Sequence, residues 1–212
     1  MIAVAGPVIL PHFLSTEDFT ALRRDVLALS GVERSFIPLH KKGGTIAYSA
    51  IRELAPEVTE FYRSRAHCQA ISDILGVWLE PTPLRDESSL SILRYERPGD
   101  HIGWHYDHNF YRGRHFTVLL AIENRGFCAE GLSASSLMVR SGTAEQAIPT
   151  PANTLVVFEG ARVLHKVTPI REGERRVVLS MTYCTDPRNS VTREIGRRIK
   201  DTAFFGLRAL WA

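Results

Sequence analysis

The segment PGDHIGWHYDHN at residues 98–109 is rich in side chains that can bind a metal ion. Side chains on a β-strand alternate between two faces, so His105 and Asp107 are predicted to share a face. His165 follows 58 residues after Asp107, in VLHKVTPI, and lies in another predicted strand. Two histidines and one carboxylate form the facial triad that leaves three positions open on Fe(II). An isolated His-x-Asp pair, in contrast, would more simply be a polar stretch of the surface.

Two arginines strengthen the metal-site interpretation. Arg175 and Arg176 lead into VVLSMTY, so a guanidinium enters a predicted strand 11 residues after His165. A buried guanidinium is suited to bidentate binding of a carboxylate, as in a dicarboxylate ligand. The alternative is a solvated strand edge.

Other residues around the His-x-Asp pair have two interpretations each. His101 falls on the predicted face of His105, where it could flank a substrate or serve as a structural histidine at a strand end. Trp104 and Tyr106 fall on the opposite face and are predicted to join the core.

The elements that position these side chains can be predicted from turn residues and hydrophobic periodicity. From residue 88 onward, short β-branched or aromatic runs alternate with Gly, Pro and Asn, which indicates a sandwich or barrel. The predicted strands are 89–95, 101–107, 116–123, 136–140, 145–148, 154–158, 163–168 and 175–183.

The first third of the chain is predicted to be helical around one short strand, Val8 to Leu10. Ser15 and Asp18 resemble a capping box that opens a helix ending near Gly31. A second helix should run from Pro56 to Leu75, with Gly76 after its C-terminal end.

The stretch from His40 to Gly44 is basic and glycine-bearing, yet it lacks the Walker spacing for phosphate. We therefore expect a mobile surface loop that could act as a lid. The tail from Val191 to Trp211 is predicted to form an amphipathic helix and an apolar anchor, which would dock onto the body or offer a partner surface.

Composition narrows the class of protein. The chain has 212 residues, 44% hydrophobic and 23% charged, which is typical of one enlarged globular domain. A net charge of +3 is too small to indicate nucleic-acid binding, and no apolar run approaches the roughly 18 residues of a membrane helix. No secretory signal is recognised, and three cysteines argue against a disulfide framework, so a cytoplasmic location is expected.

The order of these motifs resembles the Fe(II)- and 2-oxoglutarate-dependent dioxygenases of the prolyl 4-hydroxylase-like type. The resemblance covers roughly residues 89–184. The matching features are the Tyr95 strand, the His105-Tyr106-Asp107 motif, Thr117, the segment IPTPANTLVVFEGARVLHKVTPI and the closing GERRVVLSMTY.

The resemblance implies an α+β, mainly β fold, a double-stranded β-helix (jelly roll) buttressed by N-terminal helices. One domain would span 1–212, with helical support and lid at 1–86, the jelly roll at 87–185 and a helical extension at 186–212. Fe(II) would bind His105, Asp107 and His165, and the distal carboxylate of 2-oxoglutarate would bind Arg176, with Tyr95 and Ser180 as minor contacts.

The closing motif of the family also implies a strand register. Arg176 would point inward with Val178, Ser180 and Thr182, and Arg175 would point outward.

The implied reaction consumes O2 and 2-oxoglutarate and releases succinate and CO2, with ascorbate helping to keep the iron reduced. Relatives that halogenate lack the carboxylate ligand, so Asp107 argues for hydroxylation, desaturation or ring formation. We expect a small-molecule substrate, such as an amino acid derivative or secondary metabolite. The alternatives are hydroxylation of a protein side chain and, from another class, a jelly roll that binds metal without turnover.

The substrate mouth is expected at two loops, 41–45 and 109–113. The second loop follows the aspartate ligand, so Tyr111, Arg112 and Arg114 are candidate substrate contacts.

Overall fold

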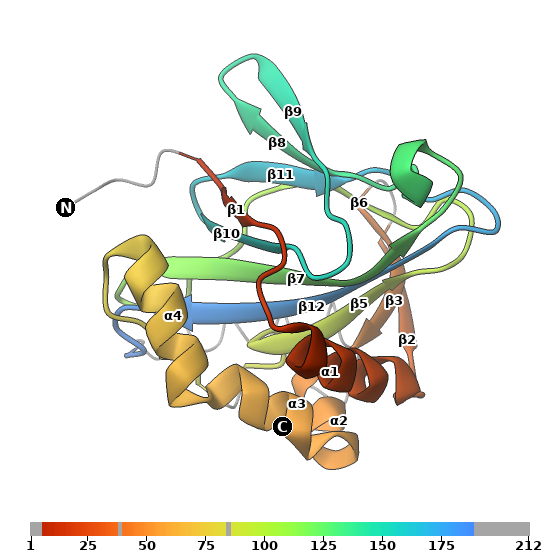
Figure 1. Cartoon of the computed structure of the whole chain (residues 1–212). Coiled ribbons are helices and arrows are strands. Elements are labelled where there is room, and N and C mark those ends of the chain that lie inside the picture. Colours follow the sequence, from red (N-terminus) through yellow and green to blue (C-terminus); the bar gives the residue numbers. More distant parts are fainter. Residues whose placement is uncertain (1–5, 38–39, 84–85, 189–212) are drawn as a thin grey trace.

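One antiparallel sheet of twelve strands runs through the computed structural model, which describes residues 6–37, 40–83 and 86–188. Its strands follow the order β1-β10-β7-β12-β5-β3-β6-β11-β8-β9, with β2 on β3 and β4 on β12. The sheet curls into the half-barrel of a jelly roll, as expected (Figure 1). The strands are β1 (Val8–Leu10), β2 (Glu33–Ile37), β3 (Lys41–Ile46), β4 (Glu80–Pro81), β5 (Leu90–Tyr95), β6 (His101–His105), β7 (His115–Arg125), β8 (Leu137–Ser141), β9 (Ala144–Ile148), β10 (Leu155–Glu159), β11 (Leu164–Val167) and β12 (Arg175–Cys184).

The eight strands predicted beyond residue 88 correspond to β5–β12, with ends within two residues of the prediction. The long strands β7 and β12 are buried on both faces, because one face packs on helices and the other lines the interior of the curl. In β12, Val177, Leu179 and Met181 belong to the core cluster that also contains helix residues. Alternation therefore directs Arg176 and Ser180 into the curl, as predicted.

Four helices lie together on one side of the sheet (Figure 1). They are α1 (Thr16–Ala28), α2 (Tyr48–Leu54), α3 (Pro56–Arg63) and α4 (Arg65–Leu75). The Ser15 side chain accepts a hydrogen bond from the backbone N–H of Asp18 at 3.1 Å, which confirms the predicted cap of α1. Gly76 ends α4 in the left-handed conformation, also as predicted.

The single helix predicted over Pro56 to Leu75 is wrong, because the chain breaks at Ser64. This residue is extended, with ψ 137°, and its hydroxyl caps the next helix by accepting from the backbone N–H of His67. Serine at a helix start is a favourable cap, so the hydrophobic periodicity continues across two helices rather than one. Helix α2 was not predicted.

The expected surface loop from His40 to Gly44 is also wrong. Residues 41–46 form β3, which pairs with β2, β5 and β6 inside the sheet. Gly44 makes this pairing possible, because a Cβ there would lie 2.5 Å from the Val32 side chain. Glycine here allows the chain segments to pack closely. The lid that was expected within residues 1–86 is therefore not at this stretch.

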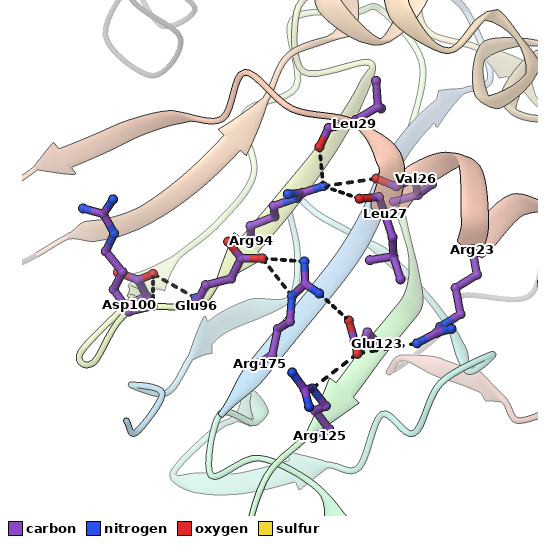
Figure 2. Close-up of polar contacts among 11 residues, drawn as sticks. Arg23, Val26, Leu27, Leu29, Arg94, Glu96, Asp100, Glu123, Arg125 and Arg175 are labelled. Atoms are coloured by element: carbon purple, nitrogen blue, oxygen red, sulfur yellow. Dashed lines mark hydrogen bonds and ion pairs between the residues drawn. The ribbon is translucent and has the colours of Figure 1, made fainter. Parts of the chain in front are cut away.

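Charged residues on the outer face join α1 to the sheet (Figure 2). The Arg94 guanidinium donates from Nη2 to the carbonyls of Leu29 at 2.8 Å and Val26 at 3.2 Å, at the C-terminal end of α1. Arg175 bridges two carboxylates, with Nε donating to Glu96 at 2.8 Å and Nη1 lying 3.2 Å from Glu123. Arg175 therefore belongs to this outer network, as the predicted register requires.

The predicted C-terminal helix and anchor at 191–211 lie outside the described residues. Among the helices that the structure describes, none is long and apolar enough to span a bilayer.

Candidate active site

His105, Asp107 and His165 come together at one end of the curled sheet. His105 is the last residue of β6, and His165 is its antiparallel partner on β11. Asp107 follows two residues after β6 ends. One ligand atom from each residue lies within 4.8 Å of the others. This spacing suits a single metal ion bound by all three side chains.

The ring orientation of both histidines is set by the backbone. His105 Nδ1 lies 2.8 Å from the carbonyl of Gly103, and His165 Nδ1 lies 3.0 Å from that of Val163. Because a carbonyl only accepts, each Nδ1 carries the proton. The free Nε2 atoms face Asp107 Oδ1, at 3.6 Å from His105 and 3.8 Å from His165. Each histidine therefore presents a lone pair where a metal would be held.

Electrostatics keep the carboxylate charged. Burial alone would raise the pKa of Asp107, but the contacts with His105, His165 and Thr117 hold it well below its usual range. Burial lowers the pKa of His165. Burial acts in the same direction on His105, but its contact with Asp107 outweighs burial and raises its pKa. An ionised carboxylate beside two imidazoles is a suitable donor set for Fe(II).

Two residues that the sequence analysis did not assign a role position Asp107. Its backbone N–H donates to the carbonyl of Gly160 at 3.0 Å, and the Thr117 hydroxyl donates to Oδ2. A Cβ on Gly160 would lie 2.4 Å from Oδ2 and 2.6 Å from the Thr117 hydroxyl. Strand alternation along β7 could have indicated that the Thr117 side chain points inward. No local feature of the sequence distinguishes Gly160.

Gly160→Ala is therefore expected to push the Asp107 carboxylate out of place and weaken metal binding about 10- to 100-fold, the range typical of lost ligand support. Anaerobic Fe(II) titration measures this. Gly6→Ala is the matched control, because nothing lies within 4 Å of a Cβ at Gly6. Unchanged affinity in Gly160→Ala would mean that the carboxylate moves aside without cost.

The expectation that His101 shares a face with His105 is wrong. Pairing between β6 and β11 shifts register: Ile102 is opposite Val167, whereas His105 is opposite His165. His105 is three residues after Ile102 on β6, whereas their partners His165 and Val167 are only two residues apart on β11. This β-bulge lets both Ile102 and His105 face the interior. The His101 ring instead contacts the carbonyl of Gly99, at 2.8 Å.

The prediction that Trp104 and Tyr106 join the core is also wrong. The Trp104 ring contacts two cations, with Arg140 at 4.4 Å and Lys166 at 4.3 Å from its centroid. Tyr106 is 50% exposed, since β6 ends at His105 and alternation no longer applies beyond it.

A cavity of about 180 Å³ opens beside the triad. The fourteen residues that line it are His40, Lys41, Ser88, Ser91, Leu93, Ile102, His105, Tyr106, Asp107, His108, His115, Thr117, Ser180 and Thr182. Ser180 is therefore in the cavity.

Arg176 and Tyr95 are opposite each other on β12 and β5, deeper in the curl. Arg176 is 2% exposed, and its guanidinium carbon lies 5.5 Å from the centre of the Tyr95 ring. Its only hydrogen-bond partner in the described chain is the Thr150 hydroxyl, 3.4 Å from Nη2, and neither Arg176 Nε nor the Tyr95 hydroxyl has a partner there. Burial lowers the pKa of Arg176 and raises that of Tyr95 to about 12. The Arg176 guanidinium and the Tyr95 hydroxyl could therefore both bind an anionic or polar ligand.

The structure does not bring Tyr111, Arg112 or Arg114 to the cavity lining. Tyr111 is buried, and its hydroxyl donates to Asp86 at 2.6 Å. Arg112 is exposed, and Arg114 binds Glu159 at 2.8 Å. Tyr111 and Arg114 are thus paired with other residues of the fold, and the role of the three residues as substrate contacts stays a prediction.

The family model described as the 2OG-Fe(II) oxygenase superfamily matches residues 90–183, a range that contains the triad and Arg176. The chain carries a 2OG-Fe(II) oxygenase domain. This confirms the prolyl 4-hydroxylase-like resemblance, and an oxygenase of this family uses Fe(II), 2-oxoglutarate and O2. The family acts on small-molecule or peptide substrates. No protein of curated function matches this oxygenase in sequence.

Several solved structures share the fold of this oxygenase. An oxidoreductase of the 2OG-Fe(II) oxygenase family from Burkholderia pseudomallei is 15% identical, with a TM-score of 0.67 over 89% of each chain. A prolyl-4-hydroxylase from Pseudomonas putida is 20% identical, with a TM-score of 0.63 over 86% of this chain and 93% of that one. The epimerase SnoN from nogalamycin biosynthesis is 15% identical, with a TM-score of 0.64 over 84% and 76%.

Proposed function

We propose that His105, Asp107 and His165 hold Fe(II) and that Arg176 binds the distal carboxylate of 2-oxoglutarate, assisted by the Tyr95 hydroxyl. The observation that carries this assignment is the buried Arg176 guanidinium, which has no carboxylate partner in the described chain. A charge that is buried without an anion is costly, and a bidentate carboxylate offsets that cost. A structural metal site would not need this cation.

When bound, Fe(II) and 2-oxoglutarate supply the oxidation by O2, with loss of CO2 from the cosubstrate to give succinate. The residues of the chain supply geometry. Asp107 and the two histidines would hold the metal, and the guanidinium of Arg176 would bind and orient the cosubstrate. Apolar side chains around them, including Leu93 and Phe158, exclude water.

We propose a small molecule as the substrate, such as an amino acid derivative or secondary metabolite. The small size of the cavity beside the triad, about 180 Å³, supports this. The intact Asp107 supports hydroxylation, desaturation or ring formation. A protein side chain is the second candidate: one related fold, a prolyl hydroxylase from Trichoplax adhaerens, was solved with a peptide fragment.

The reaction test combines purified protein with Fe(II), 2-oxoglutarate, ascorbate and air, and follows succinate against a panel of small molecules and peptides. We expect slow succinate release without substrate, stimulation by a small molecule, and complete arrest by EDTA. No 2-oxoglutarate consumption under any condition would overturn the proposal. Stimulation by peptides alone would establish the second candidate.

We also propose that the chain is a single oxygenase domain and cytoplasmic. The first point is supported by one core cluster that unites α1–α4 with the sheet. The second is supported by the three cysteines, Cys68, Cys128 and Cys184, none of which is paired.

A further inference from the structure

The basic stretch at 40–44 places two neighbouring lysines in different surroundings. Strand β3 alternates, so Lys41 is buried, 4% exposed, and lines the cavity, whereas Lys42 donates to the carbonyl of Pro98 at the surface. The Lys41 side chain runs along the strand, and its Nζ donates to the Thr45 hydroxyl at 3.0 Å. Gly43, between them on the same face, has no side chain to obstruct this path.

Lys41 lies close to the metal site. It is opposite Ile102 in the register between β3 and β6, and the ring of the preceding His40 lies 5.7 Å from that of His105. Hydroxyl groups line the same cavity, from Ser88, Ser91, Ser180 and Thr182. Apart from the metal ligands, the lining of this cavity therefore combines one ammonium group with several hydroxyl and imidazole groups.

Lysine side chains are seldom this deeply buried unless their charge is paired or serves binding or catalysis. Burial lowers the pKa of Lys41 to about 8, so the ammonium form still dominates at neutral pH. An anion entering the cavity would stabilise that charge in an environment where electrostatic contacts are strong. A carboxylate suits a single ammonium with hydroxyl neighbours, because it carries one charge and accepts several hydrogen bonds.

We propose that Lys41 determines substrate specificity by binding a carboxylate of the substrate, so that this oxygenase acts on a small organic acid. The inference rests on the proposed function and narrows its substrate class. It assigns two of the buried cations to two ligands, Arg176 to 2-oxoglutarate and Lys41 to the substrate, whereas buried Arg94 binds backbone carbonyls.

The test uses the protein loaded with Fe(II) and 2-oxoglutarate under argon, where no turnover occurs. The probes are aliphatic, aromatic and α-amino acids, each paired with its primary amide, and the readouts are the thermal midpoint and Kd. We expect at least one acid to bind the wild type about 10- to 150-fold more tightly than its amide, the range for a charge-assisted hydrogen bond. Lys41→Met should remove this preference and leave the Kd of 2-oxoglutarate unchanged.

Lys42→Met is the matched control and should behave as wild type, because that side chain is on the other face of β3. The proposal is overturned if no acid exceeds its amide in the wild type, a result that needs no variant to fold. It is also overturned if Lys41→Met keeps the preference, or if Lys41→Met weakens 2-oxoglutarate instead. Failure of wild-type protein with Fe(II) to bind 2-oxoglutarate would overturn the proposed function as well.

Discussion

Asp107→Ala and His165→Ala are each expected to abolish Fe(II)-dependent succinate formation. Each variant removes one of the three protein ligands that face the same point, within 4.8 Å of one another. Because loss of an outer supporting contact already costs about 10- to 100-fold in metal affinity, loss of a ligand should cost more than about 100-fold. Anaerobic Fe(II) titration and the succinate assay measure the two effects separately.

His101→Ala is the matched control for these variants. It removes an imidazole from the same strand as His105, yet the bulge in β6 turns it away from the cavity. Iron affinity should therefore stay at the wild-type value. Wild-type succinate formation in His165→Ala would contradict the assignment of the triad.

Arg176→Met is expected to raise the KM for 2-oxoglutarate about 10- to 150-fold while Fe(II) still binds. A charge-assisted, bidentate pair contributes on the order of 1.5–3 kcal/mol, which corresponds to that range. The guanidinium lies in the interior against Tyr95, whereas two of the metal ligands come from β6 and β11 and the third follows β6. Initial rates at varied 2-oxoglutarate concentration, with separate Fe(II) titration, check both statements.

Arg175→Met provides the control at the next position. Its side chain pairs with Glu96 and Glu123 on the outer face (Figure 2), so its loss should lower the thermal midpoint without changing the KM for 2-oxoglutarate. If Arg175→Met instead raised the KM for 2-oxoglutarate and Arg176→Met did not, Arg175 rather than Arg176 would bind the cosubstrate.

Much of the jelly roll could be predicted from local patterns. Alternation along β12 depends only on strand geometry, so the inward direction of Arg176 and the outward direction of Arg175 follow once the strand is recognised. The same holds for the N-terminal cap of α1, where Ser15 and Asp18 are three residues apart. His105 and His165 were identified because their residue types and spacing already indicate a metal site.

Local patterns failed where distant segments decide the structure. The glycines of β3 indicate a loop by composition, but pairing with β2, β5 and β6 makes the stretch a strand and turns Lys41 into the cavity. The β6 bulge arises from pairing with β11, so parity alone misplaced His101.

The clustering of His105, Asp107 and His165 was predicted correctly but for an incomplete reason. Asp107 lies beyond the end of β6, where alternation no longer holds, and Gly160 and Thr117 aim its carboxylate at the histidines. The sequence alone determined which side chains could bind iron and 2-oxoglutarate, because residue type and strand period are local properties. The tertiary structure decided how they are aimed and which lysine faces the cavity, because contacts between residues far apart in the chain set those directions.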